Sequence, residues 1–293
     1  MTDDSLRWLA PEPELTEPAL VVVLTGWIDA ASAAHRAAEA LAGATMASPI
    51  ATFDDDVYLD FRARRPVMEL RDGLNSVLRW ERTVLSVGSD ANGRDVLLLT
   101  GPEPDMAWHR FARNVGEVAV RLGVTAMAHL GAYPFAVPHT RPPRLSVSSP
   151  SHDVLARVPF LRSSIDVPAG VAAALEHEMH GRGIPALGIW AQVPHYIATM
   201  SYPAASAALL DGLEEATGVR IDADELGEEA AVQRARLDAM VAGNDEHAAM
   251  ISQIEELYDA TFDTPEADTG PSLEMLSGDE LAAEVERYLR EQS

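Results

Sequence analysis

The sequence predicts an α/β protein in which helices cover both faces of a mainly parallel sheet, and a helical segment follows at the C-terminal end. Three observations predict this class. Short apolar runs recur between residues 19 and 191. Most of them are followed by a polar or proline-marked loop and then by a helical pattern. After residue 218, helical periodicity continues without strand-like runs. Strands that alternate with helices build three layers, α/β/α.

The first strand is predicted from the near-continuous apolar run at residues 19–27, which is typical of a strand buried on both faces. Asp29 then stands where an alanine-rich helix over 30–42 needs its N-terminal cap. Further strands are predicted at 50–53, 57–65 and 76–87. The last two are joined through Arg71-Asp72-Gly73 and are expected to form an antiparallel insertion.

The stretch 95–105 repeats the order of buried strand and polar loop, and Asp105 is a candidate cap for a helix over 106–122. The remaining elements are strands at 124–130 and 186–191 and helices at 170–180 and 203–217. We expect the central strands of the sheet at 20–24, 96–99, 125–130 and 187–190.

Helical periodicity predicts two further helices at 224–242 and 246–262, which form a hairpin through Gly243-Asn244-Asp245. A linker rich in Pro, Gly, Asp and Thr follows at 263–272, and an amphipathic helix is expected at 277–291. The chain therefore divides into an α/β/α domain at 1–218, a helical hairpin at 219–262, and a linker with a tail helix at 263–293.

Composition excludes several kinds of site. The chain has no cysteine, and all 22 of its basic residues are arginine. Without cysteine the chain has no thiol nucleophile, disulfide or thiolate metal site. Without lysine it has no phosphate-loop lysine and no lysine Schiff base. The net charge is −24, and residues 211–293 contribute 23 acidic residues against 5 arginines, a net −18. This acidity argues against a nucleic-acid partner, because phosphate binding needs clustered cations.

No apolar run reaches the length of a membrane span, and the N-terminus lacks the order of a signal peptide. We therefore expect a cytoplasmic protein that does not bind a membrane.

Two Val-Pro-His sequences, which place His139 and His195 directly after predicted strands, mark the candidate ligand site. Loops at the carboxyl ends of parallel strands hold ligands in open α/β sheets. Arg141 lies in the first of these loops and could bind an anion through two hydrogen bonds. Asp29 and Glu103 follow two other predicted strands, where they could serve as a hydrogen-bond acceptor and a general acid or base.

Each of these residues also has a structural interpretation, and both interpretations stay open. Asp29 caps a helix, Glu103 lies in a surface turn, Arg141 makes an internal salt bridge, and each histidine is a hydrogen-bonded structural residue. His177 and His180 are spaced i, i+3, which does not match the i, i+4 spacing of metalloprotease helices. The sequence also lacks the serine-hydrolase elbow and the dinucleotide-binding glycine loop. We expect no metal and no cofactor.

Five segments together carry a family resemblance: TGWIDAASAA from residue 25, GPEPDMAWHRF from 101, GAYPFAVPHTRP from 131, GIWAQVPHYIA from 188 and YPAASAALLDGL from 202. With these segments the chain resembles the proteasome assembly chaperone family of the second-subunit type, in its bacterial, mainly actinobacterial, branch. The resemblance implies a phosphorylase/hydrolase-like fold with an appended helical segment, and a homo-oligomer, most simply a trimer. Eukaryotic members assist proteasome ring assembly by binding subunits, whereas the bacterial members have no established reaction.

Two functions remain open. The first is a non-catalytic binding or assembly protein, similar to a chaperone, that acts through protein–protein contacts with a protein partner. The second is a small-molecule enzyme or sensor of the nucleoside phosphorylase or hydrolase type with a crevice at the strand ends. They differ in whether Asp29, Glu103, His139, Arg141 and His195 converge on one pocket.

Overall fold

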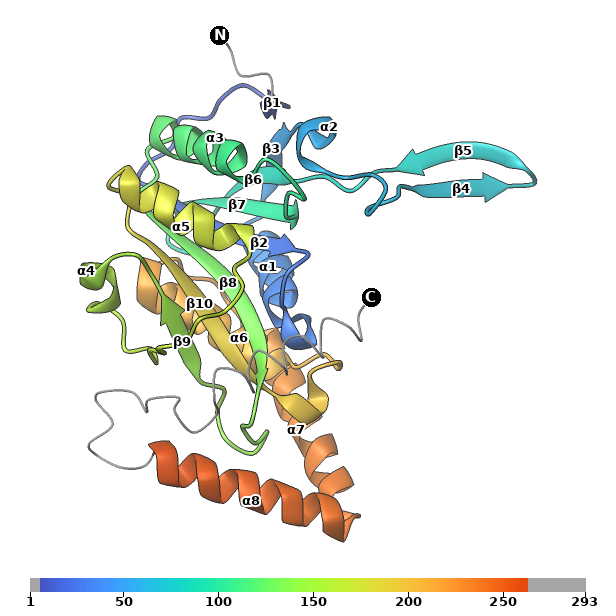
Figure 1. Ribbon diagram of the computed structural model, residues 1–293, viewed down its shortest axis with the longest axis vertical. Helices are drawn as coiled ribbons and strands as arrows, with labels where there is room; N and C mark the ends of the chain where they lie inside the picture. Colours follow the sequence, from blue (N-terminus) through green and yellow to red (C-terminus); the bar gives the residue numbers. More distant parts are fainter. Residues whose placement is uncertain (1–5, 263–293) are drawn as a thin grey trace.

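An eight-stranded mixed sheet forms the middle layer of the computed structural model, which describes residues 6–262 (Figure 1). The strand order is β1-β3-β6-β7-β2-β8-β10-β9. Four adjacent central strands run parallel to one another: β7 (Asp95–Pro102), β2 (Ala19–Thr25), β8 (Ala126–Phe135) and β10 (Ala186–Pro194). They contain the four apolar runs predicted as central strands, so this prediction is confirmed.

The outer strands pair antiparallel at both edges of the sheet. On one side they are β6 (Val84–Ser89), β3 (Ser48–Phe53) and β1 (Leu6–Trp8), and on the other side β9 (Leu145–Ser148). The sheet is therefore mixed, with its parallel part in the centre, where both faces are covered.

Helices cover both faces of the sheet, which confirms the three-layer prediction. On one face lie α1 (Ala33–Ala44) and α6 (Pro203–Thr217), and on the other α3 (Trp108–Arg121) and α5 (Val171–Gly181). Successive side chains of a strand point to opposite faces. Val21 accordingly joins the core beneath α1 and α6, and Leu20 joins the core beneath α3 and α5. This division explains why β2 is apolar at consecutive positions.

Two predicted strands were wrong. The stretch 57–65 forms no strand, because the chain turns into the short helix α2 (Asp55–Tyr58). Asp54 caps α2 by accepting a hydrogen bond from the Asp56 N–H, and acidic residues in its first turn favour a helix N-terminus. The stretch 76–87 is divided between two sheets, since only its second half, in β6, joins the main sheet.

The first half of that stretch belongs to a separate antiparallel hairpin of β4 (Val67–Arg71) and β5 (Leu74–Arg79). This hairpin projects away from the body of the protein (Figure 1). Its turn passes through Asp72 and Gly73, which have φ angles of +48° and +82°. An antiparallel insertion was expected in this region, and the hairpin together with β6 confirms it.

Asp105 does not cap α3, contrary to the prediction. The helix begins at Trp108, after Ala107 in a left-handed conformation. The Asp105 carboxylate instead accepts hydrogen bonds from the Asp60 N–H at 2.9 Å and from Arg64 Nε at 3.1 Å. It therefore holds the chain segment that leads into the β4–β5 hairpin.

Two long helices complete the described chain: α7 (Asp224–Ala242) and α8 (Asp245–Phe262). They confirm the two predicted C-terminal helices, which are together called the helical hairpin here. Asn244 begins α8 by accepting hydrogen bonds from two following N–H groups. Leu237 of α7 and Tyr258 of α8 are buried. The predicted linker and tail helix lie outside the described residues. No helix within residues 6–262 has the length and apolar character needed to cross a bilayer.

Candidate functional site

A cavity of about 320 Å³ lies between the sheet and helix α5, beside the loop 163–170. It is lined by residues of β2, β8, β9 and β10 and by the first two turns of α5. Most of its wall is apolar, and Trp27, Tyr133 and Trp190 contribute aromatic rings. The volume falls within the range of small-molecule sites, about 300–1,000 Å³.

A buried polar cluster forms one end of this cavity. Glu176 of α5 is only 4% exposed, and its Oε1 accepts a hydrogen bond from the Ser148 hydroxyl at 3.0 Å. His129 Nδ1 lies 3.0 Å from the same oxygen. Within the described residues, Glu176 Oε2 has no hydrogen-bond partner and neither His129 nitrogen makes an aligned hydrogen bond. The cluster therefore keeps unused hydrogen-bonding capacity in a buried place.

Two glycines make room for this arrangement. A Cβ atom at Gly188 would lie 2.3 Å from His129 Cε1, and one at Gly131 would lie 2.4 Å from Trp190 Cζ3. The imidazole and the indole thus pack directly on the backbones of the neighbouring strands. Glycine is required where a ring approaches the backbone this closely.

Glu103 also lines the cavity. Its Oε2 accepts a hydrogen bond from the Val171 N–H at 3.0 Å, at the first residue of α5. Burial raises the pKa of this carboxyl, while the Val171 N–H and the nearby Arg64 oppose the rise. Among the five residues predicted from the sequence, Glu103 is the one that lines this cavity.

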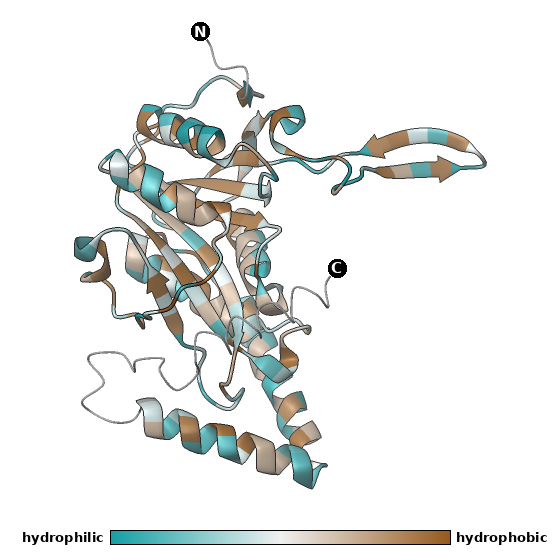
Figure 2. Ribbon diagram, in the orientation of Figure 1, coloured by the Kyte–Doolittle hydropathy of each residue, from teal (hydrophilic) through white to brown (hydrophobic). Residues whose placement is uncertain are grey.

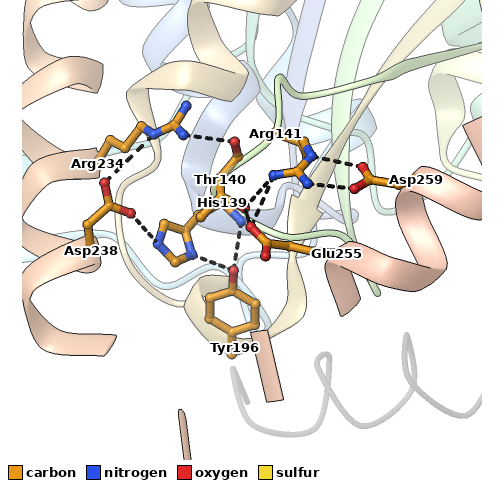
Figure 3. Close-up of polar contacts among 8 residues, drawn as sticks. All are labelled: His139, Thr140, Arg141, Tyr196, Arg234, Asp238, Glu255 and Asp259. Atoms are coloured by element: carbon orange, nitrogen blue, oxygen red, sulfur yellow. Dashed lines mark hydrogen bonds and ion pairs between the residues drawn. The ribbon is translucent and has the colours of Figure 1, made fainter. Parts of the chain in front are cut away.

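His139 contacts α7 (Figure 3) and is not among the residues that line the cavity. Its backbone N–H donates to the Tyr196 hydroxyl at 2.7 Å, and that hydroxyl lies 2.7 Å from the ring Nδ1. Nε2 faces Asp238 of α7 at 3.3 Å. Because a hydroxyl that accepts from the backbone can donate to Nδ1, this arrangement favours a neutral ring with its proton on Nε2. Burial lowers the pKa of His139, although Asp238 opposes the shift.

Arg141 contacts α8 in the same region (Figure 3). It donates two hydrogen bonds to Asp259, from Nε at 2.9 Å and from Nη2 at 2.6 Å, and a third from Nη1 to Glu255 at 3.0 Å. Thr140 also donates to Glu255. The internal salt bridge is therefore present, and an anionic ligand could reach the guanidinium only by displacing α8.

The other two predicted residues lie near the strand ends. Asp29 accepts hydrogen bonds from the N–H groups of Ala34 at 2.8 Å and His35 at 3.0 Å, so it caps α1. Burial raises the pKa of its carboxyl. His195 is exposed, and its ring packs edge-on against Tyr196 at 5.4 Å.

The structure thus brings His139, Arg141 and His195 together around Tyr196 and the hairpin, while Glu103 lies in the cavity and Asp29 at a helix start. That any of the five binds a ligand stays a prediction. Sequence reasoning missed His129, Ser148 and Glu176. Two signals were available: a histidine inside the apolar run 126–132, and a glutamate on the apolar side of helix 171–181.

The β4–β5 hairpin, here called the arm (residues 67–80), is the most apolar exposed feature described. Both of its strands carry apolar residues (Figure 2). Seven large apolar side chains are 40% to 68% exposed: Val67, Met68, Leu70, Leu74, Val77, Leu78 and Trp80. Clustered exposure of this kind marks an interaction surface.

Comparisons with known proteins show which family and which solved structures the chain is similar to. The PAC2 family model matches residues 23–241, whereas no curated protein matches the chain. Among solved structures, Rv2714 of Mycobacterium tuberculosis, of unknown function, is 32% identical with a TM-score of 0.84, covering 97% of this chain and 98% of its own. Rv2125 of the same organism, a proteasome-assembly chaperone homologue, is 32% identical with a TM-score of 0.73, covering 80% and 99%. PbaB of Pyrococcus furiosus, an archaeal proteasome activator, shares the fold at 17% identity, with a TM-score of 0.60 and coverage of 80% and 97%.

Proposed function

Since this chain belongs to the PAC2 family, we propose that it is a non-catalytic binding and assembly protein that acts through protein–protein contacts in the cytoplasm. The relative described as a proteasome-assembly chaperone homologue supports this role, at 32% identity over 80% of the chain. The positions of the predicted site residues favour the same role. They lie in three separate places, and residues in each of these places have structural hydrogen-bond partners.

The observation that carries the proposal is the exposed apolar arm. An isolated two-stranded hairpin is marginally stable in water, and it needs further packing to hold its shape. The apolar side chains of the arm are largely exposed in the single chain. A protein partner that covers them would remove this apolar surface from water and order the hairpin.

We assign the arm to a second copy of the same chain. Residues 61–82, which include the arm, contain six arginines and three acidic residues in a chain whose net charge is −24. The arm itself is neutral, with Arg71 and Arg79 against Glu69 and Asp72, and the excess of arginine lies at its base. This arginine-rich base is complementary to the acidic surface of another copy. Contact between an arm and a different surface of the next copy is head-to-tail, and such contacts form a ring where the rotation between copies closes. The trimer expected from the sequence is a ring of this kind.

In this arrangement the acidic faces of α7 and α8 remain available for a different protein partner. Most of the charged side chains in these helices are exposed. The self-associated α/β body would then serve as the scaffold, and the helical hairpins would carry the partner surface.

Hydrogen–deuterium exchange at low and high protein concentration tests the assignment of the arm. We expect the amides of β4 and β5 to gain protection as concentration rises, because association covers the arm. The amides of α1, which is far from the arm in sequence, serve as the internal control. Arm amides that exchange at the same rate at both concentrations would remove the proposed self-contact.

A further inference from the structure

The cavity beside loop 163–170 has aromatic walls and a buried carboxylate, and the proposed protein–protein contacts do not involve it. We propose that it binds a small aromatic molecule that carries a protonated amine, and that the Glu176 carboxylate receives the amine. This inference is independent of the proposed assembly role.

The walls of the cavity select for a flat, apolar body. Trp190 is fixed in place because its indole packs on Gly131 and its Nε1 donates to the Ser148 hydroxyl at 3.3 Å. Trp27 packs on Gly170, where a Cβ atom would lie 3.0 Å from Trp27 Cδ1. Rings held this firmly present aromatic surface at little cost in conformational entropy, and aromatic pairs add to the burial of apolar area.

Glu176 selects for a hydrogen-bond donor. Its carboxylate is almost fully buried, and Oε1 serves both Ser148 and His129. Oε2 has no partner among residues 6–262. Because Glu176 lines the cavity, a ligand that supplies a charged N–H donor gains by pairing with its carboxylate.

The charge of the cavity lining disfavours acidic ligands. Glu103 adds a second carboxyl to the lining, and none of the described lining residues is an arginine. The chain contains no lysine that could take this place. A carboxylate or phosphate ligand would therefore meet two acidic side chains of the lining, whereas an ammonium group is attracted to both the carboxylates and the aromatic faces.

Binding of matched probes to the full-length protein tests the proposal. Tryptamine and indole-3-propionate share an indole ring and differ in the charge of the side chain. Isothermal titration calorimetry is expected to show saturable binding of tryptamine and binding of indole-3-propionate that is at least about tenfold weaker. Glu176→Gln is expected to weaken tryptamine binding by at least about tenfold. Glu117→Gln, on the exposed side of α3, is the matched control and is expected to bind like the wild type.

Ala172→Phe provides a second variant in case Glu176→Gln does not fold. Ala172 is a half-buried residue of α5 that lines the cavity, so a phenyl ring there takes up space in the cavity without replacing a charged group. It is expected to abolish tryptamine binding while the circular dichroism spectrum stays native. The proposal is overturned if the wild type does not bind tryptamine, if it binds the acid equally well, or if folded Glu176→Gln or Ala172→Phe binds tryptamine like the wild type.

Discussion

Arg141 and Asp259 join the α/β body to the last described helix through two parallel hydrogen bonds, Nε to Oδ1 at 2.9 Å and Nη2 to Oδ2 at 2.6 Å. These bonds hold the pKa of Asp259 below its usual value. The planar guanidinium matches the carboxylate in both distance and direction, which a lysine could not do. The pair therefore fixes where α8 lies on the loop that follows β8.

Arg141→Ala should release α8 while the α/β body stays folded. The change removes the two hydrogen bonds to Asp259 and the one to Glu255, so the α8 amides should exchange hydrogen faster than in the wild type. The double variant Arg141→Asp with Asp259→Arg should recover part of the protection, because the charges pair again in reverse. Arg157→Ala, at an exposed position, is the control. Unchanged exchange in α8 of Arg141→Ala would mean that its other contacts, such as that of Tyr258 with Pro142, hold the helix without Arg141.

Buried His139 should make stability depend on pH. Burial lowers its pKa in the folded state, so the unfolded chain, with a histidine pKa of about 6.5, binds more protons than the folded one below that pH. The stabilising contribution of the neutral ring is thus present above about pH 6.5 and is lost as the pH falls towards the lowered folded-state pKa. The difference in unfolding free energy between wild type and His139→Asn should shrink from pH 7 to pH 5, as measured by urea titration. If this difference in unfolding free energy widened from pH 7 to pH 5, the lowered pKa of His139 would be contradicted.

Gly131→Ala should destabilise the fold by about 1–3 kcal/mol, the usual cost of overpacking. The added methyl group would lie 2.4 Å from the Trp190 ring, which is confined between two strands. Gly43→Ala is the matched control: no atom lies within 4 Å of its added Cβ near the end of α1, and alanine favours the helix by about 0.5–1 kcal/mol. Thermal unfolding of the two variants should shift in opposite directions. Equal shifts in the unfolding temperature of the two variants would show that the Trp190 ring can move away from the added methyl group.

The central strands were predictable because burial on both faces leaves a signal in consecutive residues. In β2, Val21 and Leu20 face different helix layers and are both apolar. The arm and its base were harder to predict, because 57–65 and 76–87 contain apolar residues whose environment is decided by the tertiary fold. In the arm, residues such as Leu74 and Leu78 are exposed, so their apolar character gave no sign of a core.

The buried cluster was not predictable from local patterns, because its members come from three separate elements. His129, Ser148 and Glu176 are brought together only when β8, β9 and α5 pack. The Val-Pro-His loops stood out in the sequence, and they do lie next to each other. Their residues His139 and Arg141 bind the helical hairpin, whose position no local pattern reveals.

Self-association through the arm is tested most directly by the mass of the protein in solution, measured by light scattering after size exclusion. We expect the wild type to have the mass of a trimer, three times the chain mass of 31.6 kDa. We expect the monomer mass for a variant with Leu70→Ser, Leu74→Ser and Leu78→Ser in the arm. A variant with the exposed α7 changes Val232→Ser and Met240→Ser should keep the wild-type mass. A wild type that elutes as a monomer, or an arm variant that stays a trimer, would contradict self-association through the arm.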